Sequence, residues 1–218
     1  MNNARKFLLF LMPMLMLAGC QGAGDGAGGG NATGAPEGDL VGASIGGDFT
    51  LTNQDGQPTR WADFDGKYRL VYFGYTYCPD VCPTDLTRIM QGYRLLERSD
   101  PAKAAKIQPI FITVDPERDT PAVVKTYVAA FHPKLIGLTG TPEEIEAVKR
   151  AFVVVASKEG DSAATQDYLV SHSRTPFLFG PDGKPIALVP TGDLQSGPDG
   201  GGEGAPAEIR DFLERFVR

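Results

Sequence analysis

The chain has 218 residues, of which 42% are hydrophobic and 22% are charged, and its formal net charge is -6. This length suits one globular domain with an additional segment, and the acidic balance argues against nucleic acid as a partner. Three cysteines allow one internal disulfide at most, too few for a scaffold that depends on disulfides. The cysteines are therefore expected to carry chemistry rather than architecture.

The first segment has the features of an export signal. A short basic region precedes the apolar run 7-FLLFLMPMLMLAG-19, which contains a proline and is too short for a stable membrane-spanning helix. The run ends in 17-LAGC-20, which resembles a bacterial lipobox, in which the cysteine is lipidated and becomes the first residue of the mature protein. We therefore expect a lipoprotein signal peptide at 1–19, a lipid on Cys20, and a location on the periplasmic side of a bacterial cell envelope, anchored to a membrane. An ordinary secretory signal is the alternative.

A glycine-rich stretch follows the predicted signal. Residues 21–38, QGAGDGAGGGNATGAPEG, have too few apolar side chains to form a core. Together with the lipidated cysteine, the segment 20–46 is predicted to be a flexible tether, and 47–218 to be the folded domain. Removal of 1–19 takes away two basic residues and no acids, so the formal charge changes from -6 to -8 (-6 - 2 = -8).

The predicted folded domain alternates strands and helices. Apolar runs indicate the strands, and apolar residues at helical spacing indicate the helices. In chain order the predicted elements are a strand from 48, a turn at Asp55–Gly56, strand 68–77, helix 84–98, strand 107–116, helix 121–131, strand 134–140, helix 141–152, strands 153–157, 168–172, 176–180 and 185–190, and a helix from Ala207. This order describes an α/β domain with a central mixed sheet flanked by helices. A long buried strand that leads to a cysteine motif at a helix start is the arrangement of thioredoxin-like folds.

Two cysteines lie in the stretch 75-YTYCPDVCPTDL-86. A thiol at a helix N-terminus is shifted towards thiolate by the unpaired N–H groups and the helix dipole. Four-residue spacing on a helical turn would place the sulfurs of Cys78 and Cys82 on one face, where they could form a disulfide or bind one soft metal ion. Redox pairs of the thioredoxin type have two intervening residues, whereas this pair has three, which better suits a metal. Cu(I) is favoured because soft thiolates select it, whereas a structural zinc site more often has four protein ligands.

A copper site needs a further donor, and the sequence has two histidines. His132, in 130-AFHPKL-135, follows a predicted helix, where a solvated, protonated histidine facing the helix dipole is the simpler interpretation. His172, in 168-YLVSHSRTPFLF-179, lies between predicted strands that could return the chain to the cysteines. Composition alone favours His172 only slightly over a surface histidine.

The chain resembles the Sco (SenC) family, thioredoxin-like copper proteins that help assemble the dinuclear copper centre (CuA) of cytochrome c oxidase. The resemblance covers roughly 47–179, and the segments that carry it, in the order and spacing of the family, are 66-GKYRLVYFGYTYCPDVCPTDL-86, 110-IFITVDPERDTP-121, 137-GLTGT-141 and 168-YLVSHS-173. It implies that Cys78, Cys82 and His172 bind copper, as Cu(I) and with Cu(II) as a second state. It also implies that Asp115 orients the site or tunes the thiols, although Asp115 could equally cap the turn that follows it.

The chain departs from the family pattern at two places. The family commonly has an acidic residue just before the histidine, whereas this chain has Ser171, which should weaken binding of Cu(II) relative to Cu(I). Pro176 resembles the proline that faces the cysteine pair in thioredoxin-like oxidoreductases, and predicts a cis bond between Thr175 and Pro176. Both departures shift the balance a little from copper delivery towards thiol chemistry.

These residues support two functions. In the first, a membrane-tethered copper chaperone holds one ion with Cys78, Cys82 and His172 and passes it to the copper-accepting subunit of cytochrome c oxidase. In the second, an enzyme, one cysteine attacks a disulfide of the copper acceptor and the other resolves it, so that the acceptor cysteines stay reduced. A metallochaperone is favoured over the thiol-disulfide oxidoreductase, and an inert module with a structural Cys78–Cys82 disulfide is a third interpretation. The chaperone requires His172, whereas thiol exchange should survive without it.

Overall fold

The computed structural model describes residues 39–159, 168–191 and 204–218. The predicted signal peptide at 1–19, the predicted lipid site Cys20 and most of the predicted tether lie outside the described residues.

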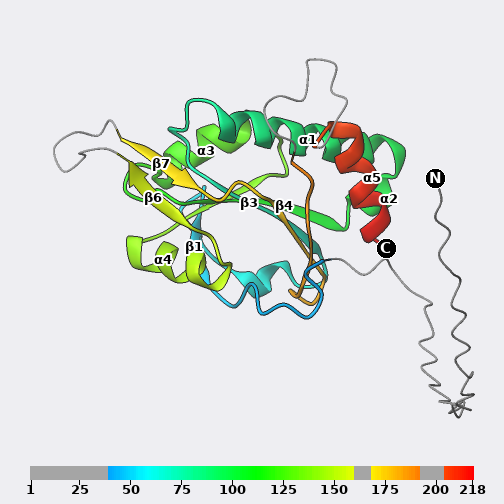
Figure 1. Cartoon of the computed structure of the whole chain (residues 1–218), viewed down its shortest axis with the longest axis horizontal. Helices are drawn as coiled ribbons and strands as arrows, with labels where there is room; N and C mark the ends of the chain where they lie inside the picture. Colours follow the sequence, from blue (N-terminus) through cyan, green and yellow to red (C-terminus); the bar gives the residue numbers. More distant parts are fainter. Residues whose placement is uncertain (1–38, 160–167, 192–203) are drawn as a thin grey trace, which may run out of the picture. The chain divides into compact units, whose positions relative to one another are not determined.

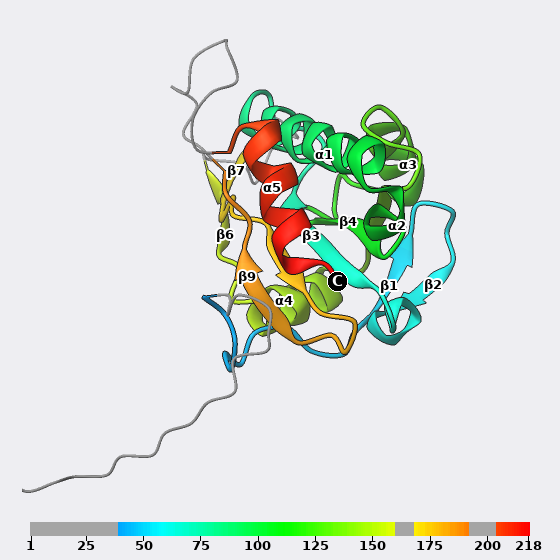
Figure 2. The ribbon, with the colours of Figure 1, turned by 90° about the vertical axis from the view of Figure 1, so that its right-hand side faces the viewer.

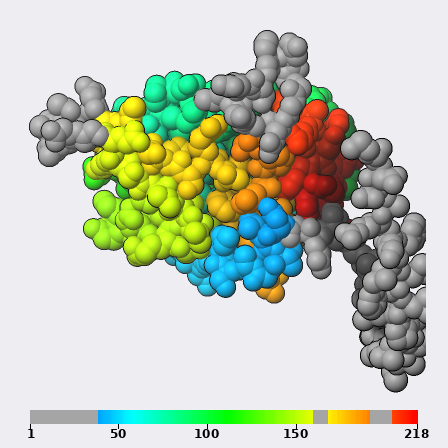
Figure 3. All heavy atoms as spheres, in the orientation of Figure 1, coloured from blue at the N-terminus to red at the C-terminus, as the bar shows by residue number. Residues whose placement is uncertain are grey.

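The described domain starts earlier than the sequence predicted. The backbone N–H of Leu40 donates to the carbonyl of Ile186, and the N–H of Gly46 donates to the carbonyl of Ala151. The side chains of Leu40 and Ile45 also pack against the core, and Figure 3 shows the blue start of this domain lying against the orange C-terminal part. Residues 39–46 therefore belong to the folded domain rather than to the tether.

A seven-stranded mixed sheet forms the centre of the described part of the chain, in the order β2-β1-β5-β4-β3-β8-β9 (Figure 1). Its strands are β1 (Thr50–Asn53), β2 (Pro58–Arg60), β3 (Tyr68–Gly74), β4 (Ile107–Thr113), β5 (Ile136–Thr139), β8 (Phe177–Phe179) and β9 (Pro185–Leu188). β3, β4 and β5 run parallel, while β1 and β8 pair antiparallel with β5 and β3. A separate antiparallel ribbon consists of β6 (Ala156–Glu159) and β7 (Leu169–His172).

Helices cover both faces of the sheet. They are the 3-10 helix η1 (Trp61–Phe64) and the α-helices α1 (Val81–Ser99), α2 (Pro101–Ala104), α3 (Pro121–Ala129), α4 (Pro142–Ala151) and α5 (Pro206–Phe216). α1 and α3 lie on one face and α4 on the other (Figures 1 and 2), and α5 packs along α1. A capping box is present at the start of α4, because Thr141 and Glu144 exchange side-chain-to-backbone hydrogen bonds. The fold class predicted from the sequence is confirmed.

The two central strands bring the loops of the candidate site together. Six of the seven residues of β3 are buried, and apart from Arg69 the strand reads as an apolar run, as buried parallel strands do. Because β3 and β4 are parallel and in register, they end at the same edge of the sheet, at Gly74 and Thr113. The N–H of Val114 donates to the carbonyl of Gly74 across this edge. The loops 75–80 and 114–120 therefore lie side by side.

The structure differs from the sequence prediction at three local points. The helix that follows the cysteine loop begins at Val81 rather than at residue 84, since Pro83 is tolerated in a first turn. The strand predicted from residue 153 begins only at Ala156, because Val153 has a positive φ of 55° and the N–H of the next residue donates back to Lys149, which closes the C-terminus of α4. The described residues contain no cis peptide bond, so the bond before Pro176 is trans and the cis prediction is wrong.

Candidate metal and thiol centre

The two cysteines face each other across the start of α1. Cys82 lies in the first turn of the helix, whereas Cys78 lies in the preceding loop, where its N–H donates to the carbonyl of Tyr75 at 3.3 Å. The N–H of Cys82 donates to the Cys78 sulfur at 3.4 Å. Both are free thiols, with Cys78 8% exposed and Cys82 fully buried. A bend in the loop, rather than one shared helical turn, therefore brings the sulfurs together.

The two thiols are electrostatically unequal. A hydrogen bond from the Cys82 thiol lowers the pKa of Cys78 to about 3, opposed by burial and aided by His172 and by the Cys82 N–H. The same hydrogen bond, together with burial, raises the pKa of Cys82 far above its ordinary value. At neutral pH the pair therefore carries one negative charge on Cys78 and one proton on Cys82.

His172 completes a group of three donors. It is the last residue of β7, and its Nε2 lies 3.0 Å from the Cys82 sulfur, while its Nδ1 lies 2.8 Å from the carbonyl oxygen of Ser173. Because a carbonyl can only accept, Nδ1 carries a hydrogen, and Nε2 is the ring nitrogen that faces Cys82. The imidazole also meets the ring of Tyr75 edge to face, with centroids 5.8 Å apart. A histidine that donates through one nitrogen presents the other as a metal ligand.

The donor set fits a soft metal ion. Two cysteine sulfurs and one imidazole nitrogen are ligands that select Cu(I). The described residues contain no three His, Cys, Asp or Glu side chains already arranged as a metal cage. Instead, the thiol proton of Cys82 faces two acceptors, the Cys78 sulfur and the His172 lone pair.

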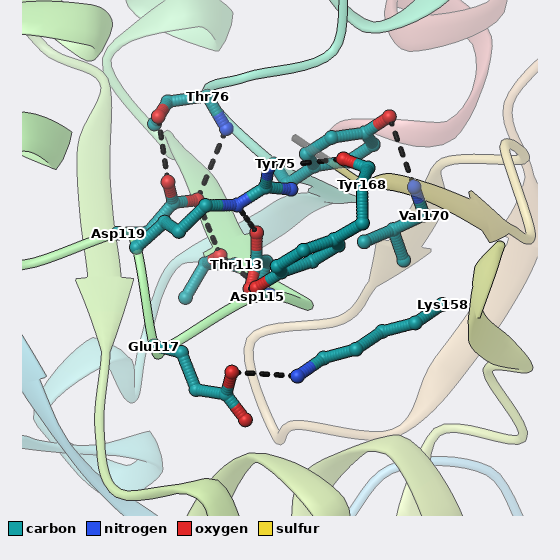
Figure 4. Close-up of polar contacts among 10 residues, drawn as sticks. Tyr75, Thr76, Thr113, Asp115, Glu117, Asp119, Lys158, Tyr168 and Val170 are labelled. Atoms are coloured by element: carbon teal, nitrogen blue, oxygen red, sulfur yellow. Dashed lines mark hydrogen bonds and ion pairs between the residues drawn. The ribbon is translucent and has the colours of Figure 1, made fainter. Parts of the chain in front are cut away.

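Asp115 belongs to a buried network beside this group (Figure 4). Its carboxylate accepts hydrogen bonds from the hydroxyl of Tyr168 at 2.6 Å and from Nε of Arg118 at 2.5 Å. The Arg118 guanidinium stacks 3.6 Å over the Tyr168 ring and lies 5.7 Å from the ring of Tyr75. The Asp115 side chain thus binds side chains of the network rather than capping the next turn. Its partner Arg118 lies beside the Tyr75 ring, which in turn contacts His172.

Asp119 is a buried residue that the sequence reasoning missed. Its carboxylate accepts hydrogen bonds from the N–H and hydroxyl of Thr76 and from the hydroxyl of Thr113, as Figure 4 shows. Burial raises the pKa of Asp119. These contacts fix the segment just before Cys78 to the end of β4.

An ion pair that the sequence reasoning also missed lies behind Cys82. Arg174 donates from Nε and Nη2 to the two carboxylate oxygens of Asp85 at 2.9 and 2.8 Å. The hydroxyl of Tyr72 donates to the same carboxylate at 3.2 Å. An acidic residue three positions after Cys82 and a basic one two positions after His172 were visible in the sequence, but only the fold shows that they meet.

The structure places the second histidine away from the cysteines. His132 is buried rather than solvated: its Nδ1 accepts from the N–H of Lys134 at 3.1 Å, so its Nε2 donates to Glu97 at 3.0 Å. Burial lowers the pKa of His132. The prediction of a solvated, protonated histidine is therefore wrong, and His132 is a neutral member of the core.

The fold and the site define a class of protein, a thioredoxin-like domain with a Cys-x-x-x-Cys loop opposed by a histidine. The sequence pattern of the SCO1/SenC family matches residues 38–197. The chain belongs to this family.

Relatives with known sequences or structures support this assignment. The mitochondrial protein SCO2 homolog of Bos taurus is 47% identical over 142 residues, which cover 65% of this chain and 52% of that protein. The mitochondrial protein SCO2 of Saccharomyces cerevisiae is 43% identical over 175 residues, which cover 80% of this chain and 54% of that protein. This chain therefore spans about half the length of these relatives. The structure of Bradyrhizobium japonicum ScoI with copper bound is 38% identical, with a TM-score of 0.66 over 79% of this chain and 99% of that one. Copper in that structure agrees with the metal expected from the sequence.

The comparisons overturn the expected location. The sequence predicted the periplasmic side of a bacterial envelope, but the curated relatives from cattle and yeast are mitochondrial proteins. Among residues 39–159, 168–191 and 204–218, no helix is long and apolar enough to cross a membrane.

Proposed function

We propose that this chain is a copper chaperone that binds one copper ion through Cys78, Cys82 and His172 and delivers it to the CuA centre of cytochrome c oxidase. The observation that carries the proposal is the 3.0 Å approach of His172 Nε2 to the Cys82 sulfur. The hydrogen bond from Nδ1 to Ser173 leaves the Nε2 lone pair free for a metal ion. The copper-bound relative and the family's link to oxidase assembly support copper as the cargo.

Each donor has a distinct part in this proposal. Cys78 already carries the thiolate that a copper ion binds, whereas Cys82 gives up its proton when copper binds. His172 binds as a neutral ligand, so two thiolates and Cu(I) make a site with a net charge of -1. Cys78 is the more exposed sulfur, and an acceptor thiolate would replace it first, before Cys82 and His172 are exchanged. No electron is transferred in this exchange.

The unequal thiols also favour a second candidate function, reduction of a disulfide in the copper acceptor. The Cys78 thiolate would attack one sulfur of that disulfide, and the other sulfur would leave as a thiolate. Cys82 would then lose its proton and attack Cys78, which forms the Cys78–Cys82 disulfide and leaves both acceptor cysteines reduced. A separate dithiol reductant would have to reduce this internal disulfide before the next cycle.

Attachment to a membrane is a separate part of the proposal, and it rests on the sequence 17-LAGC-20. A lipid on Cys20 would add the mass of its acyl chains to the N-terminal peptide. Mass spectrometry of the protein from its native cell would detect that mass, and an unmodified Cys20 would remove this part without touching the copper site.

The function is tested by anaerobic Cu(I) titration of the reduced chain in competition with a Cu(I) chelator. Cys20→Ser serves as the background, so that Cys78 and Cys82 are the only thiols. We expect one tight equivalent, loss of tight binding in Cys78→Ala and weakened binding in His172→Ala. His132→Gln is the matched control and should bind as the background does. Absence of tight binding by the reduced background, or unchanged binding in His172→Ala, would contradict the chaperone.

The same variants separate the two candidate functions. Reduction of a model disulfide should persist in His172→Ala, because the two sulfurs suffice for exchange, and should be lost in Cys78→Ala. Disulfide reduction without tight copper binding would assign the chain to the second function.

A further inference from the structure

We infer that Asp85 and Arg174 are positioning residues that hold His172 against Cys82. The inference deepens the proposed function, because it assigns a role in building the three-donor site to two residues that touch neither copper nor a partner. It rests on where these residues lie in the chain and on the geometry of their ion pair.

The ion pair connects the two halves of the site. Asp85 follows Cys82 by three residues on α1, and Arg174 follows His172 by two residues at the end of β7. Residues three apart on a helix lie on neighbouring parts of one face. One ion pair therefore joins the helix that carries a sulfur donor to the segment that carries the nitrogen donor.

The geometry of the pair suits positioning. Two parallel hydrogen bonds, 2.9 and 2.8 Å long, join the guanidinium fork to both oxygens of Asp85, and paired bonds of this kind fix direction as well as distance. The Asp85 side chain is 1% exposed, and Tyr72 donates to it from the central strand β3. Lysine could keep the charge but not the planar fork.

The remaining contacts of this segment explain why such a link is needed. β6 and β7 form a ribbon outside the main sheet, and Ser173 is bonded on that side, with its N–H donating to the carbonyl of Val155. Val170 of β7 donates to the hydroxyl of Tyr75, which ties the ribbon to the cysteine loop. Arg174 adds the link from the end of the ribbon to α1 itself. Without it, His172 would keep its place in the ribbon but lose its fixed distance from Cys82.

The first test uses the reduced, metal-free chain with Cys20→Ser, so that it does not depend on copper. NMR of the ring nitrogens of His172 reports which nitrogen carries the hydrogen and whether Nε2 is hydrogen bonded. Arg174→Gln and Arg174→Lys should both change the His172 signals, with the larger change in Arg174→Gln. Arg60→Gln, which breaks the exposed pair with Asp63, is the matched control and should leave them unchanged. Unchanged His172 signals in a folded Arg174→Gln protein would overturn the inference.

The second test is a double-variant cycle on copper affinity. Loss of a group that hydrogen bonds a metal-bound histidine typically weakens metal binding by about 10- to 100-fold. Arg174 contacts Asp85 rather than His172 itself, so Arg174→Gln should weaken Cu(I) binding by up to about tenfold. Because Arg174 acts through His172, adding Arg174→Gln to His172→Ala should cause almost no further loss. If the fold-losses of Cu(I) affinity in Arg174→Gln and His172→Ala multiply in the double variant, the inference is overturned. If the background binds no copper, the proposed function fails while the NMR test still decides on the positioning role.

Arg174→Lys is the variant to use in both tests if Arg174→Gln does not fold, because it retains the positive charge opposite the buried Asp85. If Arg174→Gln does not give a folded protein by circular dichroism, Arg174→Lys is measured alone. An affinity and ring-nitrogen signals equal to those of the background would then overturn the inference.

Discussion

The sulfur of Cys82 lies 3.0 Å from Nε2 of His172, although the two residues are 90 positions apart in the chain. This contact joins the start of α1 to the end of the ribbon β6–β7. Cys78, Cys82 and His172 therefore surround the thiol proton of Cys82, and a copper ion bound there would take the place of that proton.

The low pKa of Cys78 predicts its reactivity. In the reduced, metal-free chain, alkylation of Cys78 by iodoacetamide should change little between about pH 8 and pH 5, because the thiolate persists down to a pKa of about 3. Mass spectrometry of the peptide that contains Cys78 would measure the rate at each pH. Cys82, which is fully buried, should react far more slowly.

Cys82→Ala provides the control for this reactivity. Without the hydrogen bond from Cys82, the pKa of Cys78 should rise towards the ordinary value of about 8.5, and its alkylation rate should fall roughly tenfold per pH unit below that value. A steep fall in the parent chain, or a flat profile in the variant, would show that Cys82 does not set the charge of Cys78.

His132 predicts a loss of stability in mild acid. Burial lowers its pKa below the ordinary value of about 6.5, so the unfolded chain binds a proton more readily than the folded one. This contribution to the free energy of unfolding is complete above about pH 6.5 and is lost as the pH falls through the lower, folded pKa. Among the charged groups that face His132, Glu97 raises its pKa, whereas Arg94 and Lys134 lower it, and burial is the largest effect. The uncharged ring of Tyr93 packs against the imidazole.

His132→Gln isolates that contribution. Glutamine can donate to Glu97 and accept from the N–H of Lys134 without titrating. In urea unfolding, the stability difference between the parent chain and His132→Gln should shrink from about pH 7 to pH 5, because only the parent loses the histidine contribution. Parallel curves over this range would contradict the assignment. Glu97 should not disturb the comparison, since its pKa is lowered.

Gly92 is predicted to be required by the packing of α5 on α1. A Cβ added at Gly92 would lie 2.7 Å from Cβ and Cγ2 of Ile209 and 2.9 Å from the carbonyl oxygen of Pro206. Alanine gains about 1 kcal/mol of helix propensity over glycine, but overpacking typically costs about 1–3 kcal/mol. Gly92→Ala should therefore lower the free energy of unfolding. In an Ile209→Gly background, which removes both nearby atoms of Ile209, the same change should cost less, and equal costs in both backgrounds would refute the steric explanation.

Arg69 is predicted to stabilise the fold from inside the sheet. Its buried guanidinium donates to the carbonyls of Gly180 and Trp61 and stacks 4.5 Å over the Trp61 ring. Arg69→Met should cost roughly 1–3 kcal/mol, because it removes buried hydrogen bonds from a charged donor, while the Gly180 carbonyl keeps the N–H of Gly183 as a partner. Arg60→Met, which removes an exposed ion pair, should cost less than about 1 kcal/mol. Similar losses in the two variants would contradict the importance of burial.

The parts of the fold that local patterns specify were predictable. Largely apolar runs identified β3 and β4, and apolar residues at helical spacing identified the helices. Resemblance to known motifs selected His172, which its own surroundings in the sequence barely distinguish from a surface residue. The structure brings His172 to Cys82, whereas Asp115 binds in the neighbouring network around Arg118.

The errors occurred where contacts between distant segments outweigh the local pattern. Val153 continues a β-branched apolar run, yet the closure of α4 places it in the left-handed region and delays the next strand. His132 follows a helix as a solvated histidine would, but Glu97 and Tyr93 of α1 enclose it. Arg174 and Asp85 are 89 positions apart, so no window of the sequence shows their pairing.

The two cysteines and His172 are attached to parts of the chain that differ in their protection from hydrogen exchange. The cysteine loop continues from β3, a buried strand that is hydrogen bonded on both sides, whereas most of β6 is exposed and pairs with β7 alone. Amide hydrogens of β3 should exchange with solvent only when the whole domain unfolds, and those of β6 through brief local openings. Within the lifetime of one folded molecule, the outer strand of the ribbon can therefore open and close many times while the strand that leads to the cysteines stays closed.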